Sequence, residues 1–211
     1  MSETLLYSVA GSVATITLNR PQVMNALDAG MIARLRAVCE QACDDGAVRA
    51  IVLRGNGPAF LAGGDVALFH ANLPRLPEMV GKLAGELHHA IVALRRAPKP
   101  VLASVHGAVA GAGVSLLAAA DLAIAAIDTK FTLAYSRIAA SPDGGSTWFL
   151  PRLVGYRKAL ELMLLSDTFD AATALALGLV NWVVASAELA TETDKIAQRL
   201  ASGPTVAFGE T

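Results

Sequence analysis

Hydrophobic positions near the N-terminus follow first a strand pattern and then a helix pattern. The runs LLYSV (5–9) and SVATITL (12–18) are rich in β-branched residues and surround a glycine turn, which predicts a hairpin. Asp28 then stands where the N-cap of a helix is expected. Apolar residues follow it at helical spacing and predict a helix through about Asp45 with this buried face: Met31, Ile32, Leu35, Val38 and Ala42.

Strand and helix patterns then alternate to the end of the chain. Short apolar runs predict buried strands at 49–55, 101–106, 121–127 and 179–185. Helical spacing predicts helices at 78–96, beyond the glycine-rich segment 106–115, in three stretches between 148 and 178, and at 188–200. This alternation indicates an α/β fold with mostly buried strands. We expect one core domain over residues 1–200, with 201–211 as the start of a C-terminal helical extension that is otherwise missing.

Composition indicates a folded protein with extra buried surface. Hydrophobic residues make up 54% of the 211 residues and charged residues only 17%, so we expect an oligomer. The formal net charge is −1 and no basic block stands out, which argues against a nucleic acid partner. The most continuous apolar stretch, 108–120, contains two glycines and a serine and is too short to span a bilayer. We therefore expect neither nucleic acid nor a membrane as a partner.

The two cysteines, Cys39 and Cys43, lie four residues apart on a predicted helix. No second pair of ligands with zinc spacing accompanies them, so we interpret them as packing residues and expect no metal site. The N-terminal sequence MSETLLYSV has no basic region of the kind that opens a signal peptide. These features favour a cytoplasmic location.

Two glycine-rich segments each follow a predicted strand: FLAGGD (60–65) and HGAVAGAGVS (106–115). The second leads into a helix, whose first N–H groups lack acceptors and lie at the positive end of the helix dipole. Two such segments can direct two N–H groups at one oxygen, as an oxyanion hole does. They lack the G-K-[ST] of a P-loop, the third glycine of a dinucleotide fingerprint and the second glycine of a nucleophile elbow. On pattern alone, an anion site and tight helix–strand packing are equal alternatives.

The segment SPDGGSTW (141–148) contains one candidate acid, Asp143. Pro-Asp-Gly is a strong turn signal, because proline presets φ and glycine accepts a positive φ. Asp143 is therefore either the polar residue of a tight turn or a carboxylate held out for chemistry. The local pattern by itself favours the turn.

Five motifs in order resemble the crotonase superfamily, the enoyl-CoA hydratases and isomerases. They cover the chain from about residue 5 to 210 and read NRPQVMNAL, FLAGGDV, KPVLASVHGAVAGAGVSLLAAADLAIA, PDGGSTWFLPRLVG and ALGLVNWVV. The resemblance implies a spiral core of repeated ββα units and a homotrimer or a hexamer of trimers. It implies a coenzyme A thioester as substrate and no separate cofactor. It also implies C-terminal helices, which complete the site in this family and which we expect to be missing here.

The resemblance also assigns binding residues. It implies that the N–H groups of Gly64 and Ala112 hold the oxygen of a thioester enolate. Adenine and pantetheine contacts are implied, mostly through the backbone, near Val23, Met24, Ala62, Asp65 and Val66. Further contacts with the substrate are expected from Gly111 and from Trp148 as a wall of the acyl pocket. Ala67 stands where a lysine is often found in the family.

The sequence departs from typical hydratases at both of their catalytic glutamates, where it has Ser115 and Tyr135. Adding water across a double bond requires paired carboxylates, and neither residue is a general base at neutral pH. Asp143 changes this picture, because PDGGSTW resembles the acid turn of phenylacetyl-CoA-pathway and dienoyl-CoA isomerases. A single carboxylate is enough for isomerisation, since it removes a proton from one carbon and returns it to another. We therefore favour double-bond isomerisation with Asp143 as the acid and base.

Three alternatives remain open from the sequence. One is ordinary enoyl-CoA hydration. Another is a reaction like that of 4-chlorobenzoyl-CoA dehalogenases, or thioester hydrolysis, with Asp143 as nucleophile, His88 as base and Tyr135 as the aromatic ring beside them. The third is a non-catalytic acyl-CoA binding protein.

Overall fold

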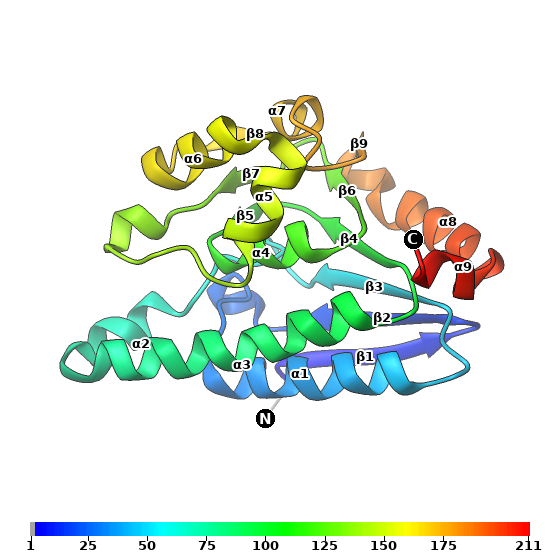
Figure 1. The fold of residues 1–211 in the computed structure, drawn as a ribbon, viewed down its shortest axis with the longest axis horizontal. Helices are drawn as coiled ribbons and strands as arrows, with labels where there is room; N and C mark the ends of the chain where they lie inside the picture. Colours follow the sequence, from blue (N-terminus) through cyan, green and yellow to red (C-terminus); the bar gives the residue numbers. More distant parts are fainter. Residues whose placement is uncertain (1–2) are drawn as a thin grey trace.

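The computed structural model describes residues 3–211, which form a six-stranded sheet, a three-stranded sheet and surrounding helices (Figure 1). The larger sheet has the order β1-β2-β3-β4-β6-β9, and only β1 and β2 are antiparallel neighbours. Its strands are β1 (Leu5–Ala10), β2 (Val13–Leu18), β3 (Ala50–Gly55), β4 (Val101–Val105), β6 (Leu122–Ala126) and β9 (Trp182–Val184). Each of the six overlaps a predicted strand, and the α/β prediction is confirmed.

The smaller sheet was not predicted. It consists of β5 (Ala108–Ala110), β7 (Lys130–Thr132) and β8 (Phe169–Asp170), in the order β5-β7-β8. The rings of Phe131 and Phe169 stack across β7 and β8 with their centroids 5.4 Å apart. Strands of two or three residues are too short to show a period of two, so only their pairing reveals them.

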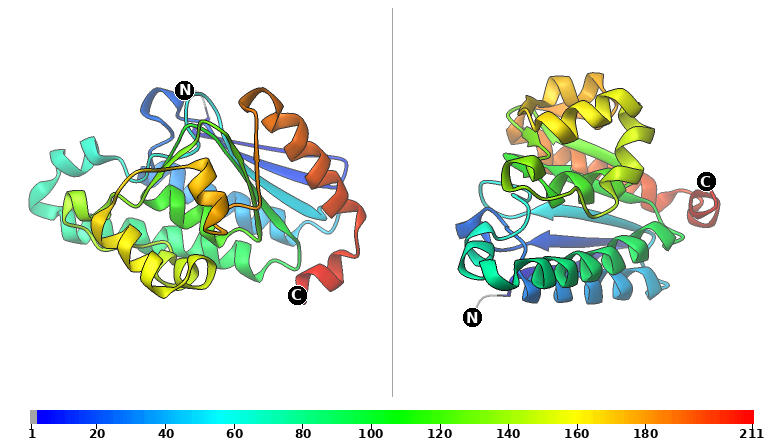
Figure 2. Two further views of the ribbon diagram at one scale, coloured as in Figure 1. Left: turned by 90° about the horizontal axis from the view of Figure 1, so that it is seen from above. Right: turned by 60° about the vertical axis from the view of Figure 1, so that its left-hand side comes forward.

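Two long helices lie side by side on one face of the large sheet (Figures 1 and 2). They are α1 (Ala29–Asp44) and α3 (Leu76–Arg96). The Asp28 side chain accepts a hydrogen bond from the backbone N–H of Met31 at 2.8 Å, and the five predicted apolar residues of α1 are all buried. The predicted N-cap and the apolar face of α1 are therefore confirmed.

The opposite face of the large sheet is covered in part by α8 (Leu189–Ser202). A separate apolar cluster lies beneath it, because alternate strand residues such as Val52 and Leu102 point toward α8. The short helix α9 (Thr205–Gly209) follows α8. The domain boundary at residue 200 stays a prediction.

The centre of the molecule is α4 (Ala112–Ala119), in which all eight residues are buried. A helix enclosed on every side has no polar face, which is why its sequence shows no amphipathic period. The remaining helices are α2 (Val66–Ala71), α5 (Ser146–Val154), α6 (Tyr156–Leu165) and α7 (Ala171–Ala176), with the 3-10 turns η1 (Pro21–Val23), η2 (Leu73–Arg75), η3 (Tyr135–Ile138) and η4 (Ser186–Glu188). Of the four α-helices, only α2 was not predicted.

In residues 3–211 we find no helix that combines the length and the apolarity of a membrane span. Over the same range, no three side chains of the metal-ligating types gather into one group.

One buried amide ties the turn after β2 to the segment that leads to the first glycine loop. The Nδ2 of Asn25 lies 2.7 Å from the carbonyl oxygen of Ala59, 2.9 Å from that of Asn56 and 3.1 Å from that of Phe60. Its Oδ1 accepts from the backbone N–H of Arg20 at 2.7 Å. Asn25 is completely buried and has a left-handed φ of 59°, a conformation that asparagine tolerates better than most residues.

We expect Asn25→Ala to lower the free energy of unfolding by about 2–4 kcal/mol, because it leaves buried carbonyl and N–H groups without partners. Urea unfolding followed by circular dichroism measures this loss. Asn19→Ala is the matched control, since the hydrogen bonds of Asn19 are solvent-exposed, and we expect it to cost less than about 0.5 kcal/mol. Equal losses in the two variants would contradict the role given to Asn25.

Candidate active site

A cavity of about 680 Å³ contains the three residues predicted to carry chemistry, Gly64, Ala112 and Asp143. The cavity lies between the first glycine loop, helices α2 and α3, the start of α4 and residues 133–143. Gly64 and Asp143 are 79 positions apart in the chain, and Ala112 lies between them. The tertiary structure therefore brings together residues that the sequence separates.

The two glycine loops meet because their backbones pair directly. The N–H of Leu61 donates to the carbonyl of Ala108 at 3.2 Å, and the N–H of Ala110 donates to the carbonyl of Leu61 at 2.9 Å. Gly113 has no room for a side chain, since a Cβ there would lie 2.3 Å from the carbonyl oxygen of Leu61. Gly63 has a φ of +98°, which strongly favours glycine. Tight packing thus accounts for some of these glycines, and it also sets the geometry of the site.

The N–H groups of Gly64 and Ala112 have no acceptor among residues 3–211. Ala112 is the first residue of α4, where an N–H lacks an intrahelical partner and the helix dipole is positive. Phe69 packs against Gly64 so closely that a Cβ on Gly64 would lie 2.5 Å from the ring. Two free donors beside one apolar cavity can stabilise an oxygen that becomes negatively charged.

The side chain of Asp143 is held by Tyr135, which donates its hydroxyl proton to Asp143 Oδ1 at 2.6 Å. The hydroxyls of Ser115 and Ser146 donate to the backbone carbonyl of Asp143 at 3.0 and 2.8 Å. Ser115 Oγ also lies 3.1 Å from the Tyr135 hydroxyl. Ser115 and Tyr135 stand where typical hydratases have glutamates. Both therefore contact Asp143, the one carboxylate in the described lining of the cavity.

Burial of the Tyr135 hydroxyl and, in second place, the negative charge of Asp143 raise the pKa of Tyr135 far above its ordinary value. The phenol therefore keeps its proton at neutral pH and acts as a hydrogen-bond donor.

The turn predicted at Pro-Asp-Gly is present, and its glycines are required. Gly144 has a φ of +57°, and a Cβ on it would lie 2.7 Å from Cβ of Ser115. Gly145, at a φ of +76°, is the N-cap residue of α5. In the segment just before this turn, Ala134 and Ala139 have left-handed φ values of 56° and 53° and bracket η3. Such conformations cost about 1–3 kcal/mol each and gather at functional sites.

The other residues expected to bind substrate fall into two groups. Ala62, Val66, Gly111 and Tyr135 line the cavity. Val23, Met24, Asp65, His88 and Trp148 do not. Of the second group, only Val23, Met24 and Asp65 lie near the first glycine loop: the N–H of Ala62 donates to the carbonyl of Met24 at 3.0 Å.

Two of these side chains, those of His88 and Trp148, correct the sequence-based expectations. His88 is exposed on α3, one residue past Leu87, and neighbours on a helix point about 100° apart, so the side that lines the cavity belongs to Leu87. Trp148 is 59% exposed and stacks on Arg152, whose guanidinium carbon lies 3.4 Å from the ring centroid, so it does not wall the acyl pocket. The Asp65 carboxylate caps α2 and pairs with Arg20 at 3.3 Å.

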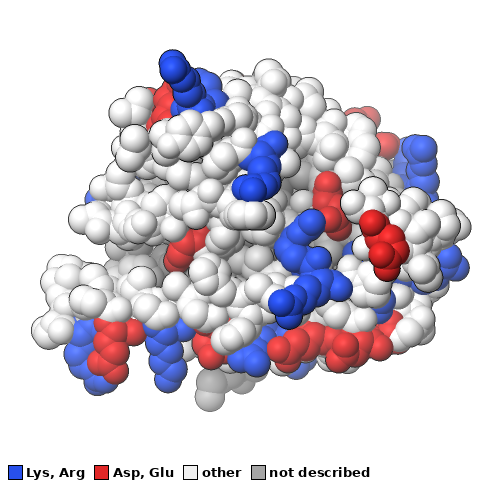
Figure 3. All heavy atoms as spheres, in the orientation of Figure 1, with Lys and Arg blue, Asp and Glu red and all other residues white. Residues whose placement is uncertain are grey.

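Most of the cavity wall is apolar. Val80, Leu83 and Leu87 of α3 face Leu133 and Ile138 across it. Positions 80, 83 and 87 recur at helical spacing within the helix predicted at 78–96. The contributions of Leu73 in η2 and Ile138 in η3 were missed, because such short turns have no period of their own. Figure 3 shows charged side chains gathered along the lower edge of the molecule, over α1 and α3, below a mostly uncharged and hollowed face.

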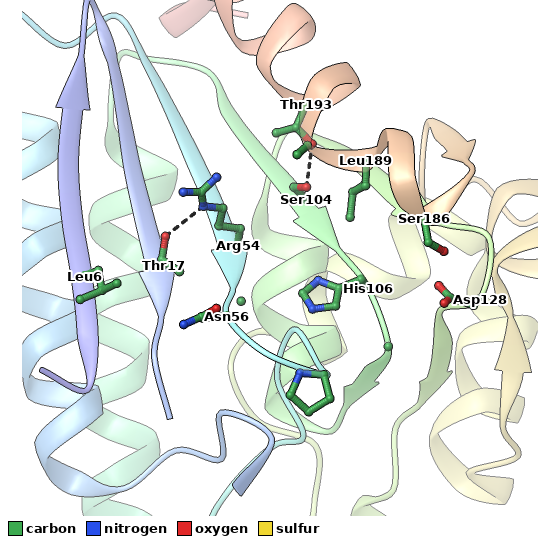
Figure 4. Close-up of a pocket in the computed structure, with 14 residues that line it drawn as sticks. Leu6, Thr17, Arg54, Asn56, Ser104, His106, Asp128, Ser186, Leu189 and Thr193 are labelled. Carbon is green, nitrogen blue, oxygen red and sulfur yellow. Dashed lines mark hydrogen bonds between the residues drawn. The ribbon is translucent and has the colours of Figure 1, made fainter. Parts of the chain in front are cut away.

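A second cleft, of about 640 Å³, lies on the opposite side of the large sheet, between β2–β4 and α8 (Figure 4). It contains none of the predicted site residues, and several of its polar groups already have partners. Arg54 Nε donates to the Thr17 hydroxyl at 3.1 Å, and the hydroxyls of Ser104 and Thr193 are 2.7 Å apart. The cavity beside Asp143 is therefore the candidate active site.

Comparisons with known proteins agree with this choice of site. A family model described as enoyl-CoA hydratase/isomerase matches residues 8–210. A Rhodobacter capsulatus protein named "Probable enoyl-CoA hydratase" is 40% identical over 208 residues, which is 97% of this chain and 78% of that protein. The 1,2-epoxyphenylacetyl-CoA isomerase of Escherichia coli is 35% identical over 210 residues, 99% of this chain and 80% of that one.

A crystal structure of an enoyl-CoA hydratase from Mycobacterium smegmatis superposes with a TM-score of 0.91 at 34% identity. It covers 99% of this chain and 80% of that chain. The fold of the protein is therefore the crotonase-like α/β fold that the sequence motifs implied.

We expect Gly113→Ala to lower the free energy of unfolding by about 1–3 kcal/mol, because the new methyl group forces the two glycine loops apart. The same displacement is expected to weaken binding of an anionic enolate analogue. Thermal and urea unfolding together with calorimetric titration measure both effects. Gly85→Ala is the matched control: it lies in α3 with nothing within 4 Å of a Cβ, and we expect it to stabilise the protein by about 0.5–1 kcal/mol. Similar behaviour of the two variants would contradict the close approach.

Proposed function

The chain belongs to the enoyl-CoA hydratase/isomerase family, and we propose that it moves a double bond along the acyl chain of a coenzyme A thioester. The observation that carries this proposal is that Asp143 is the only carboxylate among the described residues that line the cavity. Water addition requires a second acid–base group, whereas moving a proton from one carbon to another requires only one.

The reaction proceeds through an enolate that the backbone stabilises. Asp143 takes a proton from C-2 of a 3-enoyl thioester, and the electrons of that C–H bond move toward the thioester oxygen. The N–H groups of Gly64 and Ala112 bind this oxygen while it carries negative charge. Asp143 then returns the proton to C-4, and the double bond comes to lie between C-2 and C-3. Atoms and charge balance without water or a further reactant.

The apolar wall of the cavity suits a hydrocarbon acyl group. Only His70, Tyr135, Ser141 and Asp143 contribute polar side chains to the lining. Coenzyme A is part of the substrate in this proposal, with its contacts near Val23, Met24, Ala62 and Val66. A trimeric or hexameric assembly and a cytoplasmic location stay predictions.

Hydration is the second candidate, because the Rhodobacter relative bears that name. Ser115 and Tyr135, which stand where typical hydratases have glutamates, contact Asp143 and cannot serve as a second base at neutral pH. The nucleophilic alternative required His88 as a base near Asp143, and the exposed position of His88 on α3 does not provide one.

We expect Asp143→Asn to lower kcat for double-bond migration by about 10²- to 10⁴-fold with little change in KM. The assay follows conversion of a 3-enoyl-CoA that is deuterated at C-2. Because one carboxylate both removes and returns the proton, part of the deuterium is expected at C-4 of the product. Asp167→Asn is the matched control, since Asp167 is exposed and has no hydrogen bond within residues 3–211, and we expect it to keep wild-type activity.

Hydration of a 2-enoyl-CoA is measured with the same three proteins. Migration that survives Asp143→Asn, or hydration faster than migration in the wild type, would overturn the proposal. Tight binding of thioesters without turnover would favour the non-catalytic alternative.

A further inference from the structure

The two carboxylate oxygens of Asp143 differ in their hydrogen bonds. A tyrosine hydroxyl carries one proton, and a carboxylate can only accept, so the 2.6 Å contact is a bond from Tyr135 to Oδ1. No donor in the described part of the chain contacts Oδ2. The carboxylate is therefore fixed by one oxygen, and the other is free at the cavity that Asp143 lines.

The backbone of Asp143 is fixed as well as its side chain. Ser115 belongs to the first turns of α4, and Ser146 is the first residue of α5, so their hydroxyls connect the carbonyl of Asp143 to two helices. Close packing of Gly144 against Ser115 leaves the turn little room to shift. The position of the carboxylate is thus set relative to α4, which also carries the Ala112 N–H.

Tyr135 is itself held rigidly. Only 7% of its surface is exposed, and the N–H of Ala140 donates to its backbone carbonyl at 3.0 Å. The left-handed residues Ala134 and Ala139 bend the chain on either side of η3 and turn the phenol toward Asp143. The Tyr135 hydroxyl has one proton and donates it to Asp143, so it has none left to donate to a substrate.

We propose that Tyr135 is a positioning residue, which holds Asp143 by Oδ1 so that Oδ2 alone carries the proton between the two substrate carbons. This inference rests on the proposed isomerisation. It replaces the earlier expectation that Tyr135 binds substrate. Tyr135 and Ser115 stand at the positions where hydratases were expected to have glutamates. Here Tyr135 binds the carboxylate of Asp143, and Ser115 binds the backbone carbonyl of Asp143.

Tyr135→Phe tests the inference, because it removes the hydroxyl and keeps the ring. We expect kcat for double-bond migration to fall about 10- to 100-fold, as a misplaced reactive group does, while KM changes less than about twofold. Tyr156→Phe is the matched control, since Tyr156 is 68% exposed on α6 and lies outside the cavity. Circular dichroism and thermal unfolding verify that each variant is folded.

The decisive readout is the double variant Tyr135→Phe/Asp143→Asn. If Tyr135 acts only through Asp143, its loss has no further effect on kcat once the carboxylate is gone. Ser115→Ala leaves the Tyr135 bond intact and is expected to lower kcat less than Tyr135→Phe does.

The outcomes separate this inference from the proposed function. Wild-type kcat in Tyr135→Phe, together with an inactive Asp143→Asn, would overturn the inference and leave the isomerase proposal standing. Additive losses in the double variant, or a rise in KM without a change in kcat, would also overturn it. Full activity of Asp143→Asn would overturn both.

Discussion

The close approach of two backbone segments, 60–64 and 108–113, is the constraint on which the candidate site depends. Direct pairing of Leu61 with β5 brings the Gly64 and Ala112 N–H groups to one cavity. A side chain at Gly113 would collide with the Leu61 carbonyl. The close packing that these glycines allow also creates the pair of N–H donors.

Helix α4 links the two halves of the site. Its first N–H belongs to the proposed oxyanion hole, and one turn later Ser115 bonds to the turn that carries Asp143. Complete burial of all eight residues gives this helix no freedom to tilt toward solvent. The Ala112 N–H and the Asp143 carboxylate are therefore fixed relative to each other, as catalysis by preorganised groups requires.

Few polar side chains line the cavity, and hydroxyl groups surround Asp143. Tyr135, Ser115 and Ser146 give their hydrogen bonds to Asp143, and the surrounding wall is aliphatic. An apolar wall of this kind keeps water away from the reacting atoms of a bound ligand. On the other face of the sheet, the cleft under α8 is more polar, but its Ser104 and Thr193 hydroxyls bond to each other.

Local sequence determined the long elements and the chemistry of single residues. The period of α1, its cap at Asp28 and the turn at Pro142–Gly144 depend on neighbouring residues alone, so pattern was sufficient to predict them.

Only the tertiary structure decided which residues meet. The strands β5, β7 and β8 are defined by pairing rather than by period, His88 points away because Leu87 takes the cavity side of α3, and Trp148 stacks on Arg152. The hydrogen bond from Tyr135 to Asp143 joins η3 to a turn eight residues later. It forms because packing brings the two side chains together, and a local sequence pattern does not predict such packing.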